Sequence, residues 1–145
     1  MIKEFTLSTH EHYQLIDITD RIEDIITKSK VKDGLCLIFT PGSTAAIILT
    51  ENESGLKHDW LKFLKKIVEG KKNSAEGGTA SGWEHDRIDD NADSHLLSGL
   101  LGQGKTLPIE SGRLLRGTWQ QIFFVELDGP RSTRRVIVKI TFSPD

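Results

Sequence analysis

The segment from Trp83 to Leu97, WEHDRIDDNADSHLL, gathers the side chains of this protein that are best suited to chemistry. It holds two histidines, four aspartates, one glutamate and one asparagine. Imidazoles and carboxylates bind divalent metal ions and transfer protons in catalysis. Because His85 precedes a predicted helix that carries His95, a folded-back loop would bring both to Asp90. We predict His85, Asp90, Asn91 and His95 as catalytic residues, and both histidines with Asp90 as ligands of a divalent metal, zinc or magnesium.

A structural interpretation of this segment stays open. Aspartate and asparagine are preferred N-caps, and acidic side chains in a first turn stabilise the helix dipole. The spacing of the histidines and carboxylates does not match a standard zinc motif. The residues that capping alone would explain are Asp89, Asp90, Asn91 and Asp93.

The predicted helix over 92–101 places His95 on a face of small and polar residues. Its apolar stripe, which we expect to be buried, consists of Leu96, Leu97, Leu100 and Leu101. His95 shares another face with Asn91, Ser98, Gly99 and Gly102. A glycine within a helix costs about 0.5–1 kcal/mol relative to alanine. Gly99 therefore indicates close approach by a ligand or a second subunit.

Five further residues are predicted to bind substrate. Ser43 and Thr44 lie in a short connection between apolar strands, where hydroxyl and backbone N–H groups could hold a phosphate. Arg116 has the planar guanidinium that suits phosphate. Trp119 and Gln120 are expected on opposite faces of one strand and could contact a flat ring. A plain tight turn, a solvated arginine and a core tryptophan stay open as alternatives.

The order of apolar patterns predicts strands and helices in an α+β arrangement. The helices are expected to begin at Thr19 or Asp20 with a capping box to Glu23, at Asn52 or Ser54, and at Ala92. The strands are expected at 2–8, 13–18, 35–40, 45–50, 106–111, 118–127 and 134–142. Those at 35–40 and 45–50 are apolar on both faces and are expected to be central and fully buried.

These elements predict a single domain over 1–145. Its sheet should be mixed but mostly antiparallel, sandwich or barrel-like, with about three helices. The DGP sequence predicts a hairpin between the last two strands, across which Glu126 would pair with Arg131 or Arg135. The Gly/Ser-rich segment 71–82 is expected to be a mobile loop.

Net charge and the length of the apolar runs limit the classes of binding partner. The 19 basic and 21 acidic residues give a net charge of −2, so we expect no nucleic-acid partner. The longest apolar runs, 35–39 and 45–49, are far shorter than a membrane span, so we expect no membrane partner. The start of the sequence has no basic segment followed by an apolar one. The single cysteine, Cys36, lies in an apolar run, and together these features predict a cytoplasmic protein.

Three motifs carry a resemblance to a known family. They are TPGSTAAIILTEN at 40–52, EHDRIDDNADSHLLSGLLG at 84–102 and LPIESGRLLRGTWQQIFFVELDGPR at 107–131. In this order they resemble the family named after secondary thiamine-phosphate synthase, also called YjbQ-like, over nearly the whole chain. The resemblance implies a small α+β domain, a homotrimer and a weak thiamine-phosphate synthase activity. One departure stands out, because Gly42, Ser43 and Thr44 occupy the place of the family's His-Thr-Thr.

The leading hypothesis is therefore a transferase that joins a pyrimidine pyrophosphate to a thiazole phosphate as a weak or secondary activity. His85 and His95 would be metal ligands or acid–base groups, and Arg116, Ser43 and Thr44 would bind phosphate. One alternative is a metal-dependent hydrolase of a small metabolite, with Asp90 as base. Another is a non-catalytic, trimeric metabolite-binding protein. We expect a homotrimer with the His95 cleft near a subunit boundary, because the strand at 118–127 is apolar on both faces.

Overall fold

The computed structural model describes residues 1–70 and 79–142, so most of the loop expected over 71–82 lies outside the described residues. Its helices are α1 (Thr19–Ser29), α2 (Ser54–Ile67), the short 3₁₀ helix η1 (Glu84–Arg87) and α3 (Ala92–Leu101). Its strands are β1 (Ile2–Leu7), β2 (Gln14–Asp17), β3 (Gly34–Phe39), β4 (Ala45–Thr50), β5 (Gly104–Glu110), β6 (Arg113–Leu114), β7 (Gln121–Glu126) and β8 (Arg134–Phe142). The predicted α+β fold is confirmed. Within this described part of the chain, no helix has the length and apolarity of a membrane span.

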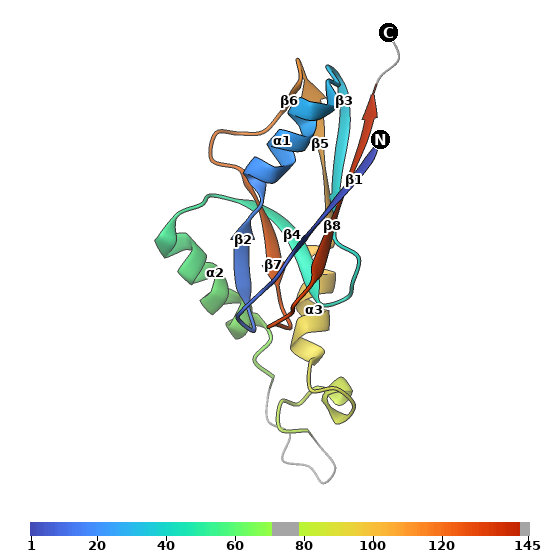
Figure 1. The fold of residues 1–145 in the computed structure, drawn as a ribbon. Coiled ribbons are helices and arrows are strands. Elements are labelled where there is room, and N and C mark those ends of the chain that lie inside the picture. The colour runs from blue at the N-terminus through green and yellow to red at the C-terminus, as the bar shows by residue number, and fades with distance from the viewer. Residues whose placement is uncertain (71–78, 143–145) are drawn as a thin grey trace.

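The strands form two antiparallel sheets (Figure 1). The larger has five strands in the order β1-β8-β3-β5-β6, and the smaller has three in the order β2-β7-β4. The predicted hairpin between the last two long strands is wrong, because β7 pairs with β2 and β4 while β8 pairs with β1 and β3. The Glu126 carboxylate folds back onto the N–H groups of Leu127 and Asp128, and the chain then leaves the three-stranded sheet.

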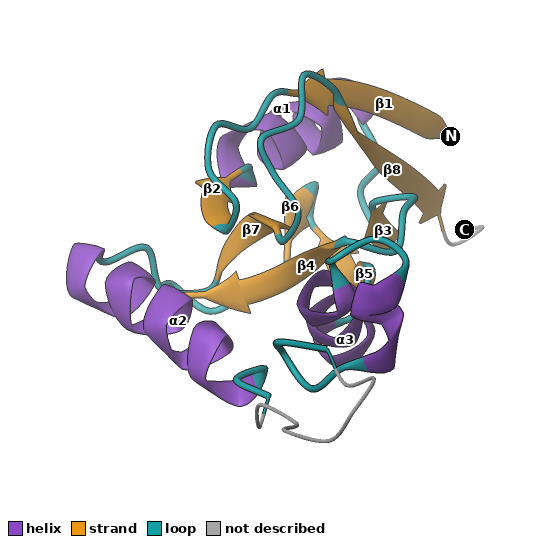
Figure 2. Cartoon of the chain, turned by 90° about the horizontal axis from the view of Figure 1, so that it is seen from below, coloured by secondary structure: helices purple, strands orange, loops and turns teal. Residues whose placement is uncertain are grey.

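Strand β7 forms the centre of the core, because both of its faces are buried within one chain. Ile122 and Phe124 pack with α1 and the five-stranded sheet. Phe123, Val125 and Leu127 pack with α2 and α3. Figure 2 shows α1 on one side of β7 and β4, with α2 and α3 on the other. The expectation that these strand faces need a second subunit is therefore wrong.

A different apolar surface is uncovered in the single chain. Strand β3 buries Cys36 and Ile38, but Leu35, Leu37 and Phe39 are 50%, 38% and 37% exposed. Since α1 packs on the opposite face of this sheet, the three side chains point outward. The prediction that 35–40 is buried on both faces is wrong, whereas β4 is largely buried as predicted. We call Leu35, Leu37 and Phe39 the β3 face.

The helix starts use different side chains from those predicted. Ile18 is the N-cap of α1 and makes no capping hydrogen bond, so the predicted capping box is wrong. Asp17 Oδ1 instead accepts a hydrogen bond from the N–H of Thr19 at 2.9 Å. Helix α2 begins at Ser54 as predicted, and the Glu53 carboxylate accepts hydrogen bonds from the first N–H groups.

Candidate functional site

Asp86 anchors the segment that carries the predicted site. One of its carboxylate oxygens accepts a hydrogen bond from the N–H of Ala92 at 2.8 Å, at the start of α3, and the other accepts from the Ser81 hydroxyl. These hydrogen bonds, that from Ser81 first, hold the pKa of Asp86 below its usual range. The N-cap residue Asn91 makes no capping side-chain bond. Asp86 therefore accepts a hydrogen bond from the first N–H of α3, and the side chain of Asn91 makes a different contact.

Of the three residues expected to converge, His85 and His95 lie together. The centroids of their rings are 4.8 Å apart and the ring planes meet at 83°. Both imidazoles line a hollow of about 370 Å³, with Trp83 and Glu84 from the η1 side and Ala92 and Leu96 from α3. Trp83 is held by a hydrogen bond from its Nε1 to the carbonyl of Val68 at 3.1 Å.

Asn91 determines which ring nitrogen of His85 carries the proton. Its Nδ2 donates to Asp128 Oδ2 at 3.1 Å, and Arg131 Nη2 donates to the same oxygen at 2.9 Å. Because a carboxylate only accepts, the amide nitrogen of Asn91 faces Asp128 and its amide oxygen faces His85. His85 Nε2 lies 3.0 Å from that oxygen, so Nε2 carries the hydrogen. In the neutral ring, Nδ1 then keeps a lone pair that can accept a proton or bind a metal.

Asp90 is not drawn into this network. It lies at the turn before α3 with a φ of 54°, and its exposed carboxylate makes no hydrogen bond or ion pair with any described residue. The nearer carboxylate is that of Asp89, with Oδ2 3.9 Å from His85 Nε2. Across residues 1–70 and 79–142, no three His, Cys, Asp or Glu side chains are grouped to hold a metal ion. Imidazole nitrogens are common ligands of divalent ions, but two of them do not complete a site, and the metal site stays a prediction.

The connection before β4 lies at the same end of β7 as Asp128. Ser43 is exposed, whereas Thr44 is buried and accepts hydrogen bonds from Arg134 Nη2 at its hydroxyl and carbonyl oxygens, at 3.0 and 3.2 Å. The N–H of Leu127 also donates to the carbonyl of Thr44 at 3.2 Å. The hydroxyl and carbonyl oxygens of Thr44 are thus occupied by hydrogen bonds within the fold, whereas the Ser43 hydroxyl is accessible to a ligand.

Glu126 is the fully buried carboxylate beneath this turn, and its predicted partners are wrong. It pairs with Arg134, whereas Arg131 pairs with Asp128 and Arg135 pairs with Glu4. Burial acts to raise the pKa of Glu126, but hydrogen bonds from Arg134 and Thr9 outweigh it and hold the pKa below its usual range. The carboxylate therefore stays charged and locks the end of β7 to β8.

Arg116, Trp119 and Gln120 lie at the opposite end of β7. Residues 121 and 126 end the strand, and five steps of about 3.3 Å separate the two ends by roughly 17 Å. The prediction that Trp119 and Gln120 share a strand is wrong, because both precede β7 in a turn closed by a Gln120-to-Gly117 hydrogen bond. Trp119 is 70% exposed. One chain therefore does not join these residues to His85 and His95.

Helix α3 packs on a different face from the one predicted. Leu97 is buried, but Leu96 and Leu100 are 47% and 66% exposed. Ser94 and Ser98 are fully buried instead, because their hydroxyls donate to the carbonyls of Leu127 and Ala45 at 2.5 and 2.6 Å. Those carbonyls lie at the ends of β7 and β4 and need donors that leucine cannot supply. Beyond the adjacent residues and the backbone of α3 itself, no atom of the described residues lies within 4 Å of the Cβ that Gly99 would carry, so they leave this space open.

A cluster around Asp93 was missed from the sequence. Asp93 Oδ2 accepts a hydrogen bond from the Tyr13 hydroxyl, and the same oxygen lies 3.2 Å from His12 Nε2. Burial, followed by this hydrogen bond, raises the pKa of Tyr13, which keeps the phenol protonated. Since eighty residues separate Tyr13 from Asp93, no local spacing could have indicated the contact.

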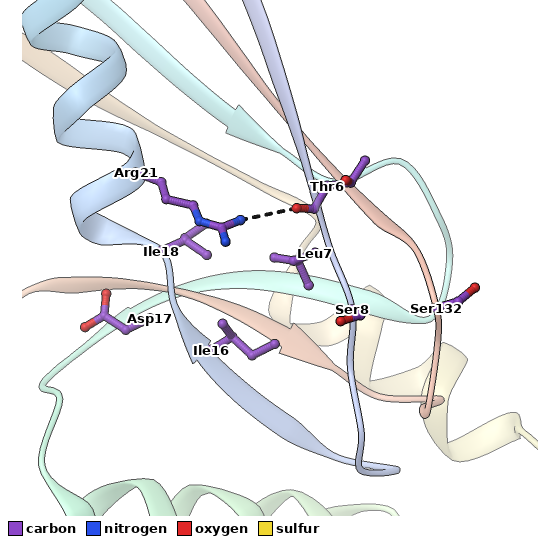
Figure 3. A pocket seen from close by; sticks show the side chains of 8 residues that line it. All are labelled: Thr6, Leu7, Ser8, Ile16, Asp17, Ile18, Arg21 and Ser132. Carbon is purple, nitrogen blue, oxygen red and sulfur yellow. Dashed lines mark hydrogen bonds between the residues drawn. The ribbon is translucent and has the colours of Figure 1, made fainter.

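Another hollow, of about 440 Å³, opens between the edges of the two sheets (Figure 3). Arg21 reaches across it from α1 and donates to the carbonyl of Thr6 at 3.2 Å. Ser8, Asp17 and Ser132 also line it, and it contains none of the predicted site residues.

The sequence profile of the family described as UPF0047 protein YjbQ-like matches residues 3–143. The chain belongs to this family. A UPF0047 protein from Archaeoglobus fulgidus is 47% identical over 136 residues, covering 94% of this chain and 98% of that protein. The UPF0047 protein YugU from Bacillus subtilis is 31% identical over 144 residues, covering 97% and 98%.

Solved structures of similar chains share the fold. A protein of unknown function from Sulfolobus solfataricus is 44% identical, with a TM-score of 0.88 and coverage of 99% of this chain and 97% of that one. A hypothetical protein from Aeropyrum pernix has a TM-score of 0.86 at 31% identity, and 99% of each chain is covered. The names of these four proteins state no reaction or ligand, so the similarity establishes family and fold.

Proposed function

We propose that this UPF0047 protein is an enzyme of the thiamine-phosphate synthase type, acting on a small phosphorylated metabolite in the hollow beside His85 and His95. One observation carries the proposal. The Asn91 amide directs the proton of His85 to Nε2, so the lone pair of Nδ1 is available beside a second imidazole. Two adjacent histidines, one of them oriented by a third side chain, are suited to moving a proton to or from a bound substrate.

The reaction needs stabilisation of a departing anion. The bond between the pyrimidine's methylene carbon and the pyrophosphate oxygen breaks, and a bond from that carbon to the thiazole nitrogen forms. Pyrophosphate leaves with the electron pair, so hydrogen-bond donors or cations near its oxygens lower the barrier. His95 makes no ring hydrogen bond with any described residue, which leaves its nitrogens available for this task.

The fold separates the residues that were predicted to bind phosphate. Ser43 is exposed there, and Arg131 lies two hydrogen bonds from Asn91, through Asp128. Arg116 precedes the opposite end of β7, a strand roughly 17 Å long. We therefore assign Ser43 and Arg131, and not Arg116, as the phosphate-binding groups of this site within one chain.

A divalent cation is the alternative use of the same lone pair. If a cation were bound, His85 Nδ1 and His95 would be its protein ligands in place of moving a proton, and the cation would neutralise charge on the pyrophosphate. Asp90, the third predicted ligand, makes no hydrogen bond or ion pair with either histidine.

The direct test is synthesis of thiamine phosphate. Purified protein supplied with the pyrimidine pyrophosphate and the thiazole phosphate should form thiamine phosphate and equal amounts of pyrophosphate. Combined His85→Ala and His95→Ala substitutions should lower the rate by about 100-fold, the low end of acid–base contributions. His58→Ala, at an exposed position of α2, is the matched control and should retain the rate.

Equal rates in the double variant and the control would assign the product to a contaminating enzyme. Phosphate release without coupling to thiazole would instead favour the hydrolase alternative. Binding of either precursor without turnover would favour the metabolite-binding alternative.

A further inference from the structure

A second polar hollow lies at the end of β7 that the proposed site does not use. Its volume is about 480 Å³, within the range of small-molecule sites. Helix α1 contributes Glu23 and Thr27, and the chain from β6 towards β7 contributes Arg113, Arg116 and Thr118. Neither His85 nor His95 lines it.

Arg116 is held in a fixed orientation in this hollow. Its Nε donates to Glu23 Oε1 at 3.1 Å, and its Nη1 donates to the carbonyl of Gln120 at 3.0 Å. The side chain is only 20% exposed. Its Nη2 has no hydrogen-bond partner within the described part of the chain, so one arm of the guanidinium presents donors without rearrangement.

The charges in this hollow favour an anion. Arg113 and Arg116 contribute two positive charges, whereas Glu23 contributes one negative charge that Arg116 already pairs with. Arg113 is exposed and makes no ion pair with any residue in 1–70 or 79–142. Thr118, which also lines the hollow, carries a hydroxyl donor, and guanidinium groups bind phosphate oxygens through paired N–H groups.

We propose that this hollow binds a phosphate ester, with Arg113 and Arg116 on the phosphate oxygens. An ester fits better than free phosphate, because the space exceeds one phosphate group and Leu114 provides an apolar wall for an organic part. The site is separate from the His85 site and does not depend on the function proposed for it.

Binding of phenyl phosphate and of inorganic phosphate, followed by NMR shifts of backbone amides, tests this assignment. We expect shifts concentrated at 113–118 and in α1, with tighter binding of the ester. R113Q and R116Q should each weaken binding about tenfold, as expected for loss of a charge-assisted hydrogen bond. R135Q removes an exposed arginine of β8 that does not line this hollow, and it is the charge-matched control.

Two further comparisons make the result decisive. The doubly substituted His85→Ala, His95→Ala protein should bind phenyl phosphate as the natural sequence does, and loss of binding there would overturn the proposal. Equal affinity in R113Q and R135Q would overturn it too. Because Arg113 is exposed, R113Q gives a readable result even where R116Q weakens the fold through loss of its contact with Glu23.

Discussion

Asn91 acts on His85 through the two ends of one amide group. Asp128 accepts a hydrogen bond from the amide nitrogen, and the amide oxygen accepts a hydrogen bond from His85 Nε2. A histidine without such a partner samples both tautomers, and only one of them leaves Nδ1 unprotonated. In the proposed site, the orientation of His85 therefore depends on a residue one step removed, as is common for oriented histidines.

Asn91→Ala should release this control. We expect imidazole nitrogen NMR of neutral His85 to change from one tautomer to a mixture, and the proposed activity to fall about 10–100-fold. Asn52→Ala is the control, because Asn52 hydrogen-bonds to Asp17 and not to either histidine. A single, unchanged His85 tautomer in Asn91→Ala would contradict the assignment.

At the scale of elements, the buried pair Glu126–Arg134 joins three strands. Glu126 ends β7, Arg134 begins β8, and Arg134 also binds the oxygens of Thr44 just before β4. The same carboxylate accepts the N–H groups that lead to Asp128. The pair thus sets the position of Asp128, to which Asn91 is bound.

The pair makes stability depend on pH in a defined direction. The pKa of Glu126 is lowered in the folded state, so its contribution is fully present above the unfolded value near 4.5 and is lost as pH falls through the folded pKa. Glu126→Gln should cost about 3–5 kcal/mol at neutral pH, because Arg134 loses its buried partner. Urea denaturation should show this cost shrinking in acid.

Glu4→Gln is the control for that measurement, since Glu4 and Arg135 form an exposed pair. A pH-independent difference between Glu126→Gln and the natural sequence would show that the carboxylate's charge does not contribute.

At the scale of the whole molecule, the described residues leave apolar surface uncovered on several elements. The β3 face is one such surface, and α2 carries another, with Phe63 and Ile67 54% and 43% exposed. Extended apolar surface on a sheet usually marks contact with another chain. The family resemblance implies a trimer, and the open space at Gly99 is consistent with a neighbour close to His95.

We expect a homotrimer that covers the β3 face. Light scattering at micromolar concentration should give about three times the chain mass of 16.2 kDa. Leu37→Glu, which puts a charge on the β3 face, should shift the mass to that of the monomer. Phe63→Glu on α2 is the control and should keep the trimer mass. A monomer mass for the natural sequence would contradict this prediction.

The sequence by itself determined the elements and the pairing of the two histidines. Helical and strand periodicities follow from the local pattern of apolar residues, so α1, α2, α3 and most strands could be predicted. His85 and His95 are ten positions apart around one helix start, and local chain geometry suffices to bring them together.

Only the tertiary structure decided which strands share a sheet and which polar groups meet. The separation of β7 from β8, the pairing of Glu126 with Arg134 and the distance of Arg116 from His85 depend on contacts between remote parts of the chain. The burial of Ser94 and Ser98 in place of Leu96 and Leu100 has the same origin. Strand ends present carbonyls that require donors, and the sequence does not show where a helix will meet them.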